Sequence, residues 1–348
     1  MVIMVKEDAD DLKARTLQNL RHSPRIKAKV LLIHDFFIHN VIRYEYLFEE
    51  FIDSLKEAYE MGGGELPGFR QEVLGGGYAS NIAFSLASLG VNCKLLIKGG
   101  EFAAEMATRL FPSVEIISYQ GTPGLTTTLE FSPNINIEMS YPGSNDNFPP
   151  SLIMGESFND VDLVSINNYW INRSGAELLQ YVLEKTSCPI YLTTGNPLGH
   201  EKDFIILFNT LLDNGERLRI SLSETEAPIY MAALGIAHRG DRITVDEIGE
   251  LSAALGCSVD LHTPDYAITS KYMVPTFRLR TIYRSMRASN LWNGGNIFGT
   301  LMGLKGDERM VLANGLAGLR ISQTGSWMKC PTLEDVMGFM EKNSLKAI

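Results

Sequence analysis

Cysteine, positive charge and long apolar runs are all scarce in this 348-residue sequence, and each scarcity excludes a class of protein. The four cysteines, Cys93, Cys188, Cys257 and Cys330, lie far apart and form no C-x-x-C pair. The sequence therefore predicts neither a zinc site nor a redox-active cysteine pair. Cysteines in this arrangement favour a location in the reducing cytosol. The net charge is −10 with histidine neutral. A nucleic-acid groove or a surface for anionic membranes needs a basic patch, so neither partner is expected.

Apolar runs are too short for a membrane protein. None approaches the roughly 18 residues that a membrane-spanning helix requires. The N-terminal segment MVIMVKEDADDLKARTLQNLRHS is charged where a signal peptide would be apolar. We therefore expect a soluble, cytoplasmic protein. One locally basic stretch, Arg278, Arg280, Arg284 and Arg287, could form an anion site, although such a run is more often a solvated face.

What the sequence does contain is an alternation of β-rich and helical runs. Residues 1–25 are expected to form an arm with a short charged helix that ends near Ser23-Pro24. After it, strands are expected at 27–34, 93–100, 114–119, 161–166, 189–194 and 218–223, and helices at 41–61, 80–90, 102–111, 175–186 and 203–214. This order with short connections predicts an α/β fold, a mainly parallel sheet covered by helices on both faces.

One region departs from the alternation of strands and helices. Segments 126–131 and 135–139 each alternate apolar and polar residues, and Ser132-Pro133-Asn134 separates them. This pattern predicts a β-hairpin. Inside an α/β series we expect such a hairpin to be a lid or an extension of the sheet edge.

Three glycines, Gly75, Gly76 and Gly77, separate a short strand from a helix and are compatible with two kinds of binding site. In a dinucleotide fold they would place a pyrophosphate on the helix N-terminus, but the acidic residue expected after the next strand is here Lys98. Alternatively, they bring the backbone close to a polyhydroxylated ligand, to which Asn81 donates and accepts through its amide. Asn81 could also simply satisfy the backbone of its own helix start.

A second glycine pair, Gly294 and Gly295, is expected to precede a helix whose apolar face is formed by Ile297, Leu301 and Leu304. Unpaired amides at a helix start, together with the helix dipole, form an anion hole without a basic side chain. The pair therefore predicts a phosphate-binding site.

Between the two glycine sites, an expected strand ends in Ser223, Glu224 and Glu226 before an Ala-rich helix. Carboxylates at the C-terminal end of a strand suit an Mg²⁺ ion that is held mainly through water. Glutamates at a helix start are also favoured by the helix dipole alone. Both explanations fit the sequence.

The order of these motifs resembles the ribokinase-like (phosphofructokinase-B) family of carbohydrate and nucleoside kinases. GGGYASNIA, SETEA, NGGN and LANGLAGLRISQTGS follow one another in the family's order within roughly residues 28–342. The resemblance implies a three-layer α/β domain at residues 26–348 with a mainly parallel sheet and a small β lid. The lid elements would lie at about 36–75 and 120–148.

The resemblance also implies an acceptor site. The family's Gly-Gly-x₃-Asn signature falls on Gly76, Gly77 and Asn81. Together with Asp35 and His39, which follow the first strand, these residues would bind a sugar or a nucleoside. His39 replaces the family's sugar-binding aspartate.

The family's Gly-Ala-Gly-Asp box is placed on Asn293-Gly294-Gly295-Asn296. The first three residues would bind phosphate, and Asn296 stands where the catalytic aspartate is expected. An amide cannot accept the proton of the hydroxyl group, and general-base help is typically worth about 10²–10⁴-fold in rate. In a loose transition state positioning and charge stabilisation carry most of the acceleration, so a slow kinase is physically allowed.

For the nucleotide, ATP or ADP, the resemblance implies contacts with Ser223 and Asn314, and an Mg²⁺ ion at Glu226. Ser223 replaces the asparagine of the family's magnesium motif, whereas the glutamate is kept. The segment SVDLHTPDYAIT is also similar to a His-Thr strand of ADP-dependent sugar kinases, which leaves the phosphoryl donor open. His262 in that segment could equally be a satisfied core histidine.

Three functions fit the sequence. The first is a sugar or nucleoside kinase with an altered base, for which Asp35 and His39 are candidates, since an unperturbed histidine titrates near neutrality. The second is a non-catalytic member of the fold that binds a nucleotide or sugar as a sensor or partner protein. The third is a dinucleotide-dependent oxidoreductase. The helix expected at 41–61 presents apolar residues that could be buried under the lid or against another chain, so a homodimer is compatible with the sequence.

Overall fold

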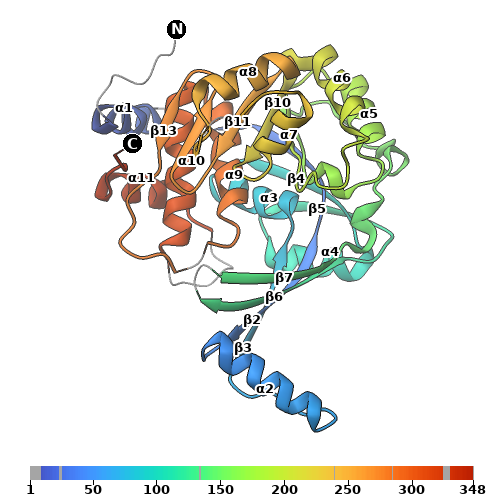
Figure 1. Ribbon diagram of the computed structural model, residues 1–348. Coiled ribbons are helices and arrows are strands. Elements are labelled where there is room, and N and C mark those ends of the chain that lie inside the picture. Colours follow the sequence, from blue (N-terminus) through green and yellow to red (C-terminus); the bar gives the residue numbers. More distant parts are fainter. Residues whose placement is uncertain are drawn as a thin grey trace.

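The computed structural model describes residues 9–22, 26–132, 135–238, 240–283, 285–323 and 330–347. The chain forms a body around a nine-stranded sheet, from which a four-stranded sheet projects (Figure 1). The predicted α/β class, with a mainly parallel sheet, helices on both faces and a small β lid, is confirmed.

The central sheet has the order β13-β12-β11-β10-β9-β8-β1-β4-β5, and only β12 and β13 at one edge run antiparallel to their neighbours. Its strands are β1 (Lys29–His34), β4 (Asn92–Lys98), β5 (Val114–Tyr119), β8 (Leu163–Ile166), β9 (Ile190–Thr193), β10 (Leu218–Ser223), β11 (Ser258–His262), β12 (Tyr266–Thr269) and β13 (Met273–Pro275). Every residue of β8 and β9 is buried, as expected for parallel strands covered on both faces.

Helices cover both faces of this sheet and enclose two hydrophobic cores. The first core is built with α1 (Ala9–His22), α3 (Tyr78–Ser88), α4 (Gly100–Leu110), α9 (Ala288–Leu301), α10 (Gly306–Ile321) and α11 (Leu333–Lys342). The second is built with α5 (Gly175–Lys185), α6 (Phe204–Asn214), α7 (Ala227–Ala233) and α8 (Val245–Leu255). Short 3₁₀ helices occur at η1 (Gly143–Asp146), η2 (Pro150–Ile153), η3 (Tyr169–Ile171) and η4 (Gly215–Arg217). Within the described part of the chain, no helix has both the length and the apolarity to span a bilayer.

The N-terminal helix α1 is attached to the body and does not hang free. Leu12, Leu17 and Leu20 are buried in the first core. Arg15 forms ion pairs with Asp307 and Glu308 at the start of α10. The expected helix is therefore present, while its expected end at Ser23-Pro24 lies outside the described residues.

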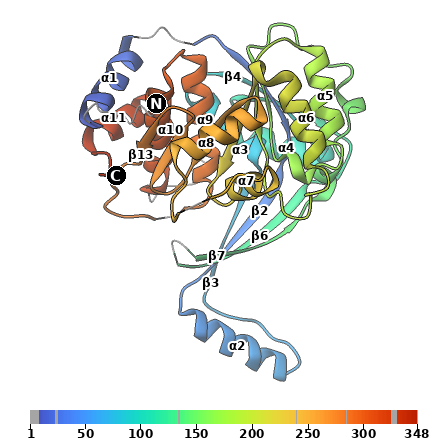
Figure 2. The same ribbon diagram turned by 45° about the horizontal axis from the view of Figure 1, so that its top comes forward.

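We call the projecting unit, residues 37–76 and 124–141, the lid. It consists of β2 (Phe37–Tyr44), α2 (Phe48–Glu60), β3 (Phe69–Gly76), β6 (Gly124–Ser132) and β7 (Ile135–Tyr141), with the sheet order β3-β2-β6-β7. The predicted hairpin is present as β6 and β7, although part of its turn lies outside the described residues. Figures 1 and 2 both show α2 at the end of the lid farthest from the body.

Two sequence predictions about the lid region are wrong. The helix expected at 41–61 begins only at Phe48, because the alternating residues before it extend β2, which pairs with β3 and β6. The dinucleotide interpretation of the Gly75–Gly77 turn also fails. The strand before this turn, β3, belongs to the lid and runs antiparallel to β2, so no parallel βαβ unit surrounds the glycines.

The helix start expected after Gly294 and Gly295 is wrong as well, because α9 already begins at Ala288. Both glycines lie inside this helix and allow close packing of its neighbours. A Cβ atom on Gly294 would lie 1.8 Å from Oγ of Ser85 in α3, and one on Gly295 would lie 2.8 Å from Cα of Ala313 in α10. Their amides are helix-interior groups, which do not form the unpaired donors of a helix start.

Candidate binding site

A cavity of about 320 Å³ lies between the lid and the body, at the carboxyl edge of the central sheet. It is lined by Asp35, Phe37, His39, Gly77, Tyr78, Asn81, Thr126, Glu138, Ser140, Asn168, Ile171, Met286, Arg287, Ser289 and Asn290. Ligands of open α/β sheets bind outside this edge. Four residues predicted for the acceptor site, Asp35, His39, Gly77 and Asn81, are thus brought to one cavity, and the fifth, Gly76, packs against His39.

Asp35 organises one wall of the cavity. Its carboxylate accepts hydrogen bonds from the backbone amides of Tyr78 (3.0 Å) and Ala79 (2.6 Å), and from Nδ2 of Asn168 (3.0 Å). It therefore caps the start of α3 from a neighbouring segment and satisfies donors that the helix leaves unpaired. The carboxylate is buried and is held in place by these bonds.

Gly77 makes this arrangement possible. Its φ is +108°, and a Cβ atom on it would lie 2.8 Å from the carbonyl oxygen of Asp35. Any other residue would strain the backbone and push the two segments apart. The glycine turn thus keeps Asp35 next to α3, where Asn81 lies one turn into the helix and is 4% exposed.

The start of α9 forms another part of the wall. Arg287 precedes the helix in the left-handed conformation, with φ +67°, and its guanidinium donates to the carbonyl oxygen of Gly75 in the lid. Burial, followed by the charge of Arg320, lowers the pKa of Arg287 to about 10, so the group stays charged at neutral pH. Asn290 in the first turn is 9% exposed, and its Oδ1 atom has no hydrogen-bond partner among the described residues.

The helix start suggests another placement of the Gly-Ala-Gly-Asp box, which the resemblance puts at the beginning of a helix. A box that opens a helix corresponds to Arg287-Ala288-Ser289-Asn290, six residues before the predicted position. The placement of the box on 293–296 is therefore wrong, because those residues lie in the helix interior. With this placement Arg287 and Ser289 would stand for the two glycines, and Asn290 for the catalytic aspartate.

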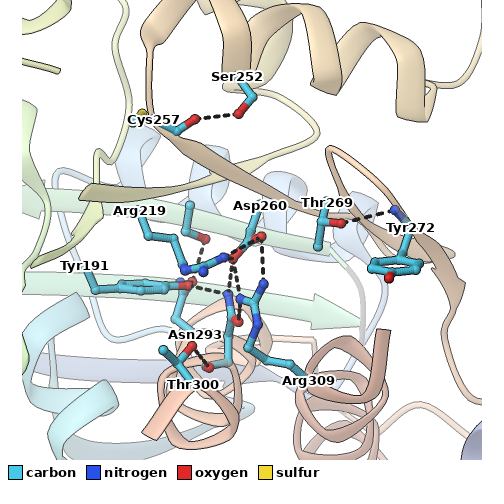
Figure 3. Close-up of polar contacts among 12 residues, drawn as sticks. Tyr191, Arg219, Ser252, Cys257, Asp260, Thr269, Tyr272, Asn293, Thr300 and Arg309 are labelled. Atoms are coloured by element: carbon cyan, nitrogen blue, oxygen red, sulfur yellow. Dashed lines mark hydrogen bonds and ion pairs between the residues drawn. The ribbon is translucent and has the colours of Figure 1, made fainter. Parts of the chain in front are cut away.

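Asn293 and Asn296 are buried, belong to a polar network and do not line the cavity. Figure 3 shows Asn293 in this network with Tyr191, Asp260 and Arg309. Asn296 donates through Nδ2 to Asp260 (2.9 Å) and to the hydroxyl of Tyr191 (2.8 Å), and its Oδ1 accepts from Arg309. Asn293 accepts from the same tyrosine hydroxyl. Asn296 does not line the cavity and its side chain is used in these bonds, so the structure does not place it where a catalytic residue was predicted.

Asp260 is the charged centre of this network. Burial opposes its ionisation, but Arg309 and Arg219 outweigh that effect and hold the pKa of the carboxyl well below its usual range. Nη1 of Arg309 lies 2.5 Å from the carboxylate, and Nη1 of Arg219 lies 3.0 Å from it. The network ties β10 and β11 to α9 and α10, so its function is structural.

Asn314 is also committed to the structure. Its Oδ1 accepts from Nε1 of Trp292 (2.8 Å), and its Nδ2 donates to the carbonyl oxygens of Val274 and Pro275. The side chain is 2% exposed and links α10 to α9 and β13. The predicted nucleotide contact of Asn314 stays a prediction.

Ser223 and Glu226 lie at the carboxyl end of β10, beside the cavity and not in its wall. The Glu226 carboxylate accepts from the backbone amide of Ser223 at 2.7 Å. Burial raises the pKa of Glu226 to about 7, against the effect of the hydrogen bonds from Ser223. Burial, followed by the charges of Glu226, Asp35 and Glu138, raises the pKa of Tyr78, which lines the cavity.

The basic stretch divides between surface and cavity. Arg278 and Arg280 are exposed, Arg284 lies outside the described residues, and Arg287 lines the cavity. His262 at the end of β11 is a satisfied histidine, since its Nε2 lies 3.1 Å from Oγ of Ser289 and its ring packs on Trp292.

Tyr78, Glu138 and Asn168 complete the cavity and were not predicted from the sequence. No motif marks Asn168, although its left-handed φ of +52° places it at a turn after β8. Glu138 lies in the hairpin that was expected to form a lid. The alternation of apolar and polar residues along β7 could therefore have indicated that Glu138 faces the cavity.

His39 is not the near-neutral base that the sequence suggested. Burial, followed by the charge of Arg287, lowers its pKa to about 4, and its Nε2 lies 2.5 Å from Oγ1 of Thr128. The ring is therefore neutral at pH 7. In the cavity wall the charged groups are then the carboxylates of Asp35 and Glu138 and the guanidinium of Arg287.

This lowered pKa predicts a pH dependence of stability. The unfolded chain protonates His39 near pH 6.5 and the folded chain only near pH 4, so stability is lost as the pH falls through this window. His39→Gln is expected to reduce the loss of unfolding free energy between pH 7 and pH 5 by about 2 kcal/mol. Urea unfolding at pH 7 and pH 5 measures the free energy of unfolding of the wild type and of His39→Gln. His22→Gln, on the surface helix α1, is the control variant. An unchanged loss in His39→Gln would contradict the buried, neutral ring.

Comparisons with solved structures agree on the fold. Thermotoga maritima ribokinase superposes with a TM-score of 0.69 at 14% identity, over 91% of this chain and 100% of that one. Burkholderia thailandensis nucleoside kinase, solved with inosine, gives 0.65 at 15% identity over 90% and 98%. Arabidopsis thaliana ribokinase, solved with ribose and ATP, gives 0.67 at 12% identity over 91% and 99%.

No protein-family model and no curated protein sequence matches the chain. The similarity is thus one of structure, at identities too low to transfer an activity. The chain has the fold of the ribokinase-like carbohydrate and nucleoside kinases.

Proposed function

We propose that the protein binds a sugar or a nucleoside in the cavity between lid and body, with a nucleotide beside it, and lacks the efficient phosphoryl transfer of kinases with this fold. One observation carries the proposal. The cavity keeps its acceptor-side residues Asp35 and Asn81, whereas the start of α9 offers it the guanidinium of Arg287 and the amide of Asn290 in place of a carboxylate.

A neutral polyhydroxylated ligand fits the composition of the wall. Asp35, Asn81 and Asn168 supply oxygen acceptors and amide donors from the body, and Thr126 and Ser140 supply hydroxyl groups from the lid. Such a few convergent polar groups fix the orientation of a ligand. Two carboxylates against one guanidinium disfavour a strongly anionic group in the same space. Ribose and inosine, found in the similar structures, are ligands of this class.

The nucleotide and its Mg²⁺ would lie toward the end of β10. Among the described residues, no cluster of three or more histidine, cysteine or acidic side chains could hold a metal ion by itself. Glu226 is a single carboxylate beside the cavity, which fits an Mg²⁺ ion that arrives with nucleotide phosphates and keeps most of its waters. The ion would offset phosphate charge, and the Ser223 hydroxyl would be a further contact.

Transfer is slow because no described side chain at the α9 start can take the proton of the acceptor hydroxyl. The Asn290 amide is not basic. Both oxygens of Asp35 accept bonds that hold α3, and the His39 ring has a pKa of about 4. Loss of general-base help removes about 10²–10⁴-fold of rate.

A slow kinase is the second candidate, and Arg287 is the observation that favours it. A guanidinium at the start of α9 places a permanent positive charge where the helix dipole already favours anions. Such a charge can stabilise the oxygens of a transferring phosphoryl group.

A thermal-shift screen with sugars, nucleosides, ATP and ADP, with and without Mg²⁺, tests the proposed function. We expect a neutral polyol ligand to raise the melting temperature, since a ligand at 100 times its Kd adds about 2.7 kcal/mol of stability. Asn81→Ala should lose the shift relative to its own melting temperature, while Asn159→Ala, at an exposed asparagine outside the cavity, should keep it.

Two results would refute the binding proposal. The first is a screen in which no sugar or nucleoside shifts the wild-type protein. The second is rapid turnover, near the 1–100 s⁻¹ of typical kinases, which would show that an amide at the α9 start does not limit transfer.

A further inference from the structure

A serine and a histidine meet at the start of α9, in the wall of the cavity. Oγ of Ser289 lies 3.1 Å from Nε2 of His262, the last residue of β11. Both side chains are half-buried, and Ser289 lines the cavity, so its hydroxyl group is open to a bound ligand. A serine hydroxyl within hydrogen-bond reach of a histidine nitrogen is the arrangement of an activated nucleophile. The binding of a sugar or nucleoside alone makes no use of this pair.

The protonation state of His262 fits a proton acceptor. Burial lowers the pKa of His262 to about 4, against the effects of a hydrogen bond with its own backbone and of the charge of Asp260. The ring is therefore neutral at pH 7. We assign its one proton to Nδ1, because this nitrogen is the one nearer to the backbone of His262. Nε2 is then free of a proton and accepts from the hydroxyl group of Ser289.

The neighbours of Ser289 can stabilise the charges that an attack by its hydroxyl group creates. Ser289 and Asn290 lie in the first turn of α9, where backbone amides have no acceptor inside the helix. These amides and the helix dipole favour an oxyanion, and the charge of Arg287 just before the helix adds to them. On β11, Asp260 lies two residues before His262, and its charge favours the protonated ring.

The composition of the cavity limits which electrophile can approach Ser289. Two carboxylates against one guanidinium disfavour a strongly anionic ester, such as a phosphate ester. An ester of a carboxylic acid carries no charge. Phe37, Ile171 and Met286 add apolar side chains to the wall, and Met286 lies three residues before Ser289. A short acyl chain can lie against such side chains, while the polar groups of the wall bind the alcohol part.

We propose that Ser289 is the nucleophile and His262 the general base of an ester hydrolase whose substrate is a sugar or nucleoside with a short O-acyl group. The alcohol part of this substrate rests on the proposed function, in which Asp35 and Asn81 bind hydroxyl groups. Asn290 lines the same cavity, and its buried Oδ1, which has no partner among the described residues, can accept from a further hydroxyl group.

The reaction has two steps. In the first, Oγ of Ser289 forms a bond to the carbonyl carbon of the ester, and its proton moves to Nε2 of His262. The bond from this carbon to the alcohol oxygen then breaks, and the alcohol leaves with the proton from His262. In the second step a water molecule attacks the acyl group on Ser289, again through His262. The carboxylic acid leaves, and the serine hydroxyl is restored.

A fluorophosphonate probe tests the nucleophile without a sugar. Such a probe forms a bond from its phosphorus to the oxygen of an activated serine and loses fluoride. We expect a single label, which peptide mass spectrometry finds on Ser289. Ser289→Ala should take no label. His262→Gln, which keeps a hydrogen-bond acceptor but no base, should be labelled about 10²–10⁴-fold more slowly. Ser187→Ala, at an exposed serine outside the cavity, should be labelled like the wild type.

Hydrolysis of two esters tests the activity. We expect the wild type to release p-nitrophenolate from p-nitrophenyl acetate and acetate from mono-O-acetylinosine, and Ser289→Ala to fall to the rate without protein. A wild type that takes no label and hydrolyses neither ester overturns the proposal, as does a Ser289→Ala variant that hydrolyses both at the wild-type rate. Release of p-nitrophenolate without deacetylation of the inosine overturns the substrate class. Circular dichroism confirms that each variant is folded.

Failure of this proposal is distinguishable from failure of the proposed function. A thermal shift by free ribose or inosine, together with no label and no ester hydrolysis, refutes the hydrolase and leaves sugar or nucleoside binding in place. Label and hydrolysis of p-nitrophenyl acetate, together with no thermal shift by any sugar or nucleoside, support Ser289 as the nucleophile and refute the alcohol part of the substrate.

Discussion

Asn290→Asp is expected to raise the rate of phosphoryl transfer to a hydroxyl ligand by about 10²–10⁴-fold over the wild-type rate. The Oδ1 atom of Asn290 lies at the start of α9, lines the cavity and has no partner among the described residues. A carboxylate in this position could accept the proton of the acceptor hydroxyl, while the rest of the site stays as it is. Nucleotide turnover with the ligand that gives the largest thermal shift measures the gain.

Asn296→Asp is the matched control, because it makes the same change six residues later. We expect no gain in transfer and a loss of stability. The new carboxylate would lie next to Asp260 and could no longer donate to it or to Tyr191. If Asn296→Asp gained activity and Asn290→Asp did not, the original alignment of the box would be right and the corrected one wrong.

Asp260→Ala is expected to lower the free energy of unfolding by about 3–5 kcal/mol, because removing one partner of a buried ion pair leaves the other charge uncompensated. Arg309 is 4% exposed and would keep its charge with no carboxylate beside it. Arg219 and Asn296 would each lose a partner as well. Denaturant unfolding at neutral pH measures the loss.

Asp265→Ala provides the comparison for a surface pair. Asp265 lies 2.8 Å from Nζ of Lys346, but its side chain is 61% exposed. Exposed pairs of this kind contribute about 0–1 kcal/mol. Equal losses for the two alanine variants would contradict the assignment of Asp260 as the buried centre of a structural network.

Most helices and strands of the body were predictable because the sequence patterns that indicate them are local and recur along the chain. The strand expected at 27–34 is β1, and the helix expected at 80–90 is α3, with Gly90 following it at a φ of +92°. Buried parallel strands appear as short apolar runs, and a glycine in the left-handed region marks a helix end. These features need no knowledge of distant residues.

The boundary between β2 and α2 was not predictable in the same way. Residues 41–44 carry side chains that fit the first turn of an amphipathic helix, yet β2 pairs with β3 and β6 across its length. The partner strand β6 lies more than 80 residues away, and such tertiary pairing overrides a local preference.

The position of the catalytic box failed for a related reason. Two glycines before an apolar run match a helix start, but Gly294 and Gly295 are small because Ser85 and Ala313 pack against them. The residues before the two glycines indicate the correct start of the helix. Leu291 and Phe298 are seven positions apart, as residues on one face of a helix are. The helical pattern therefore extends to the N-terminal side of the glycines. In the structure the helix begins at Ala288, with Asn290 in its first turn.

The sequence did group residues that the structure brings together. Asp35, His39, Gly77 and Asn81 are separated by up to 46 positions in the sequence and line one cavity. What could not be predicted was their electrostatics. The neutral state of His39 depends on its burial in the folded structure and on Arg287, which lies far away in the sequence.

A crystal structure with the polyol ligand that gives the largest thermal shift tests the central claim most directly. We predict density for the ligand in the cavity between lid and body, with hydroxyl groups within hydrogen-bond distance of Asp35 and Asn81. Density at any other place, with this cavity filled only by water, would contradict the account.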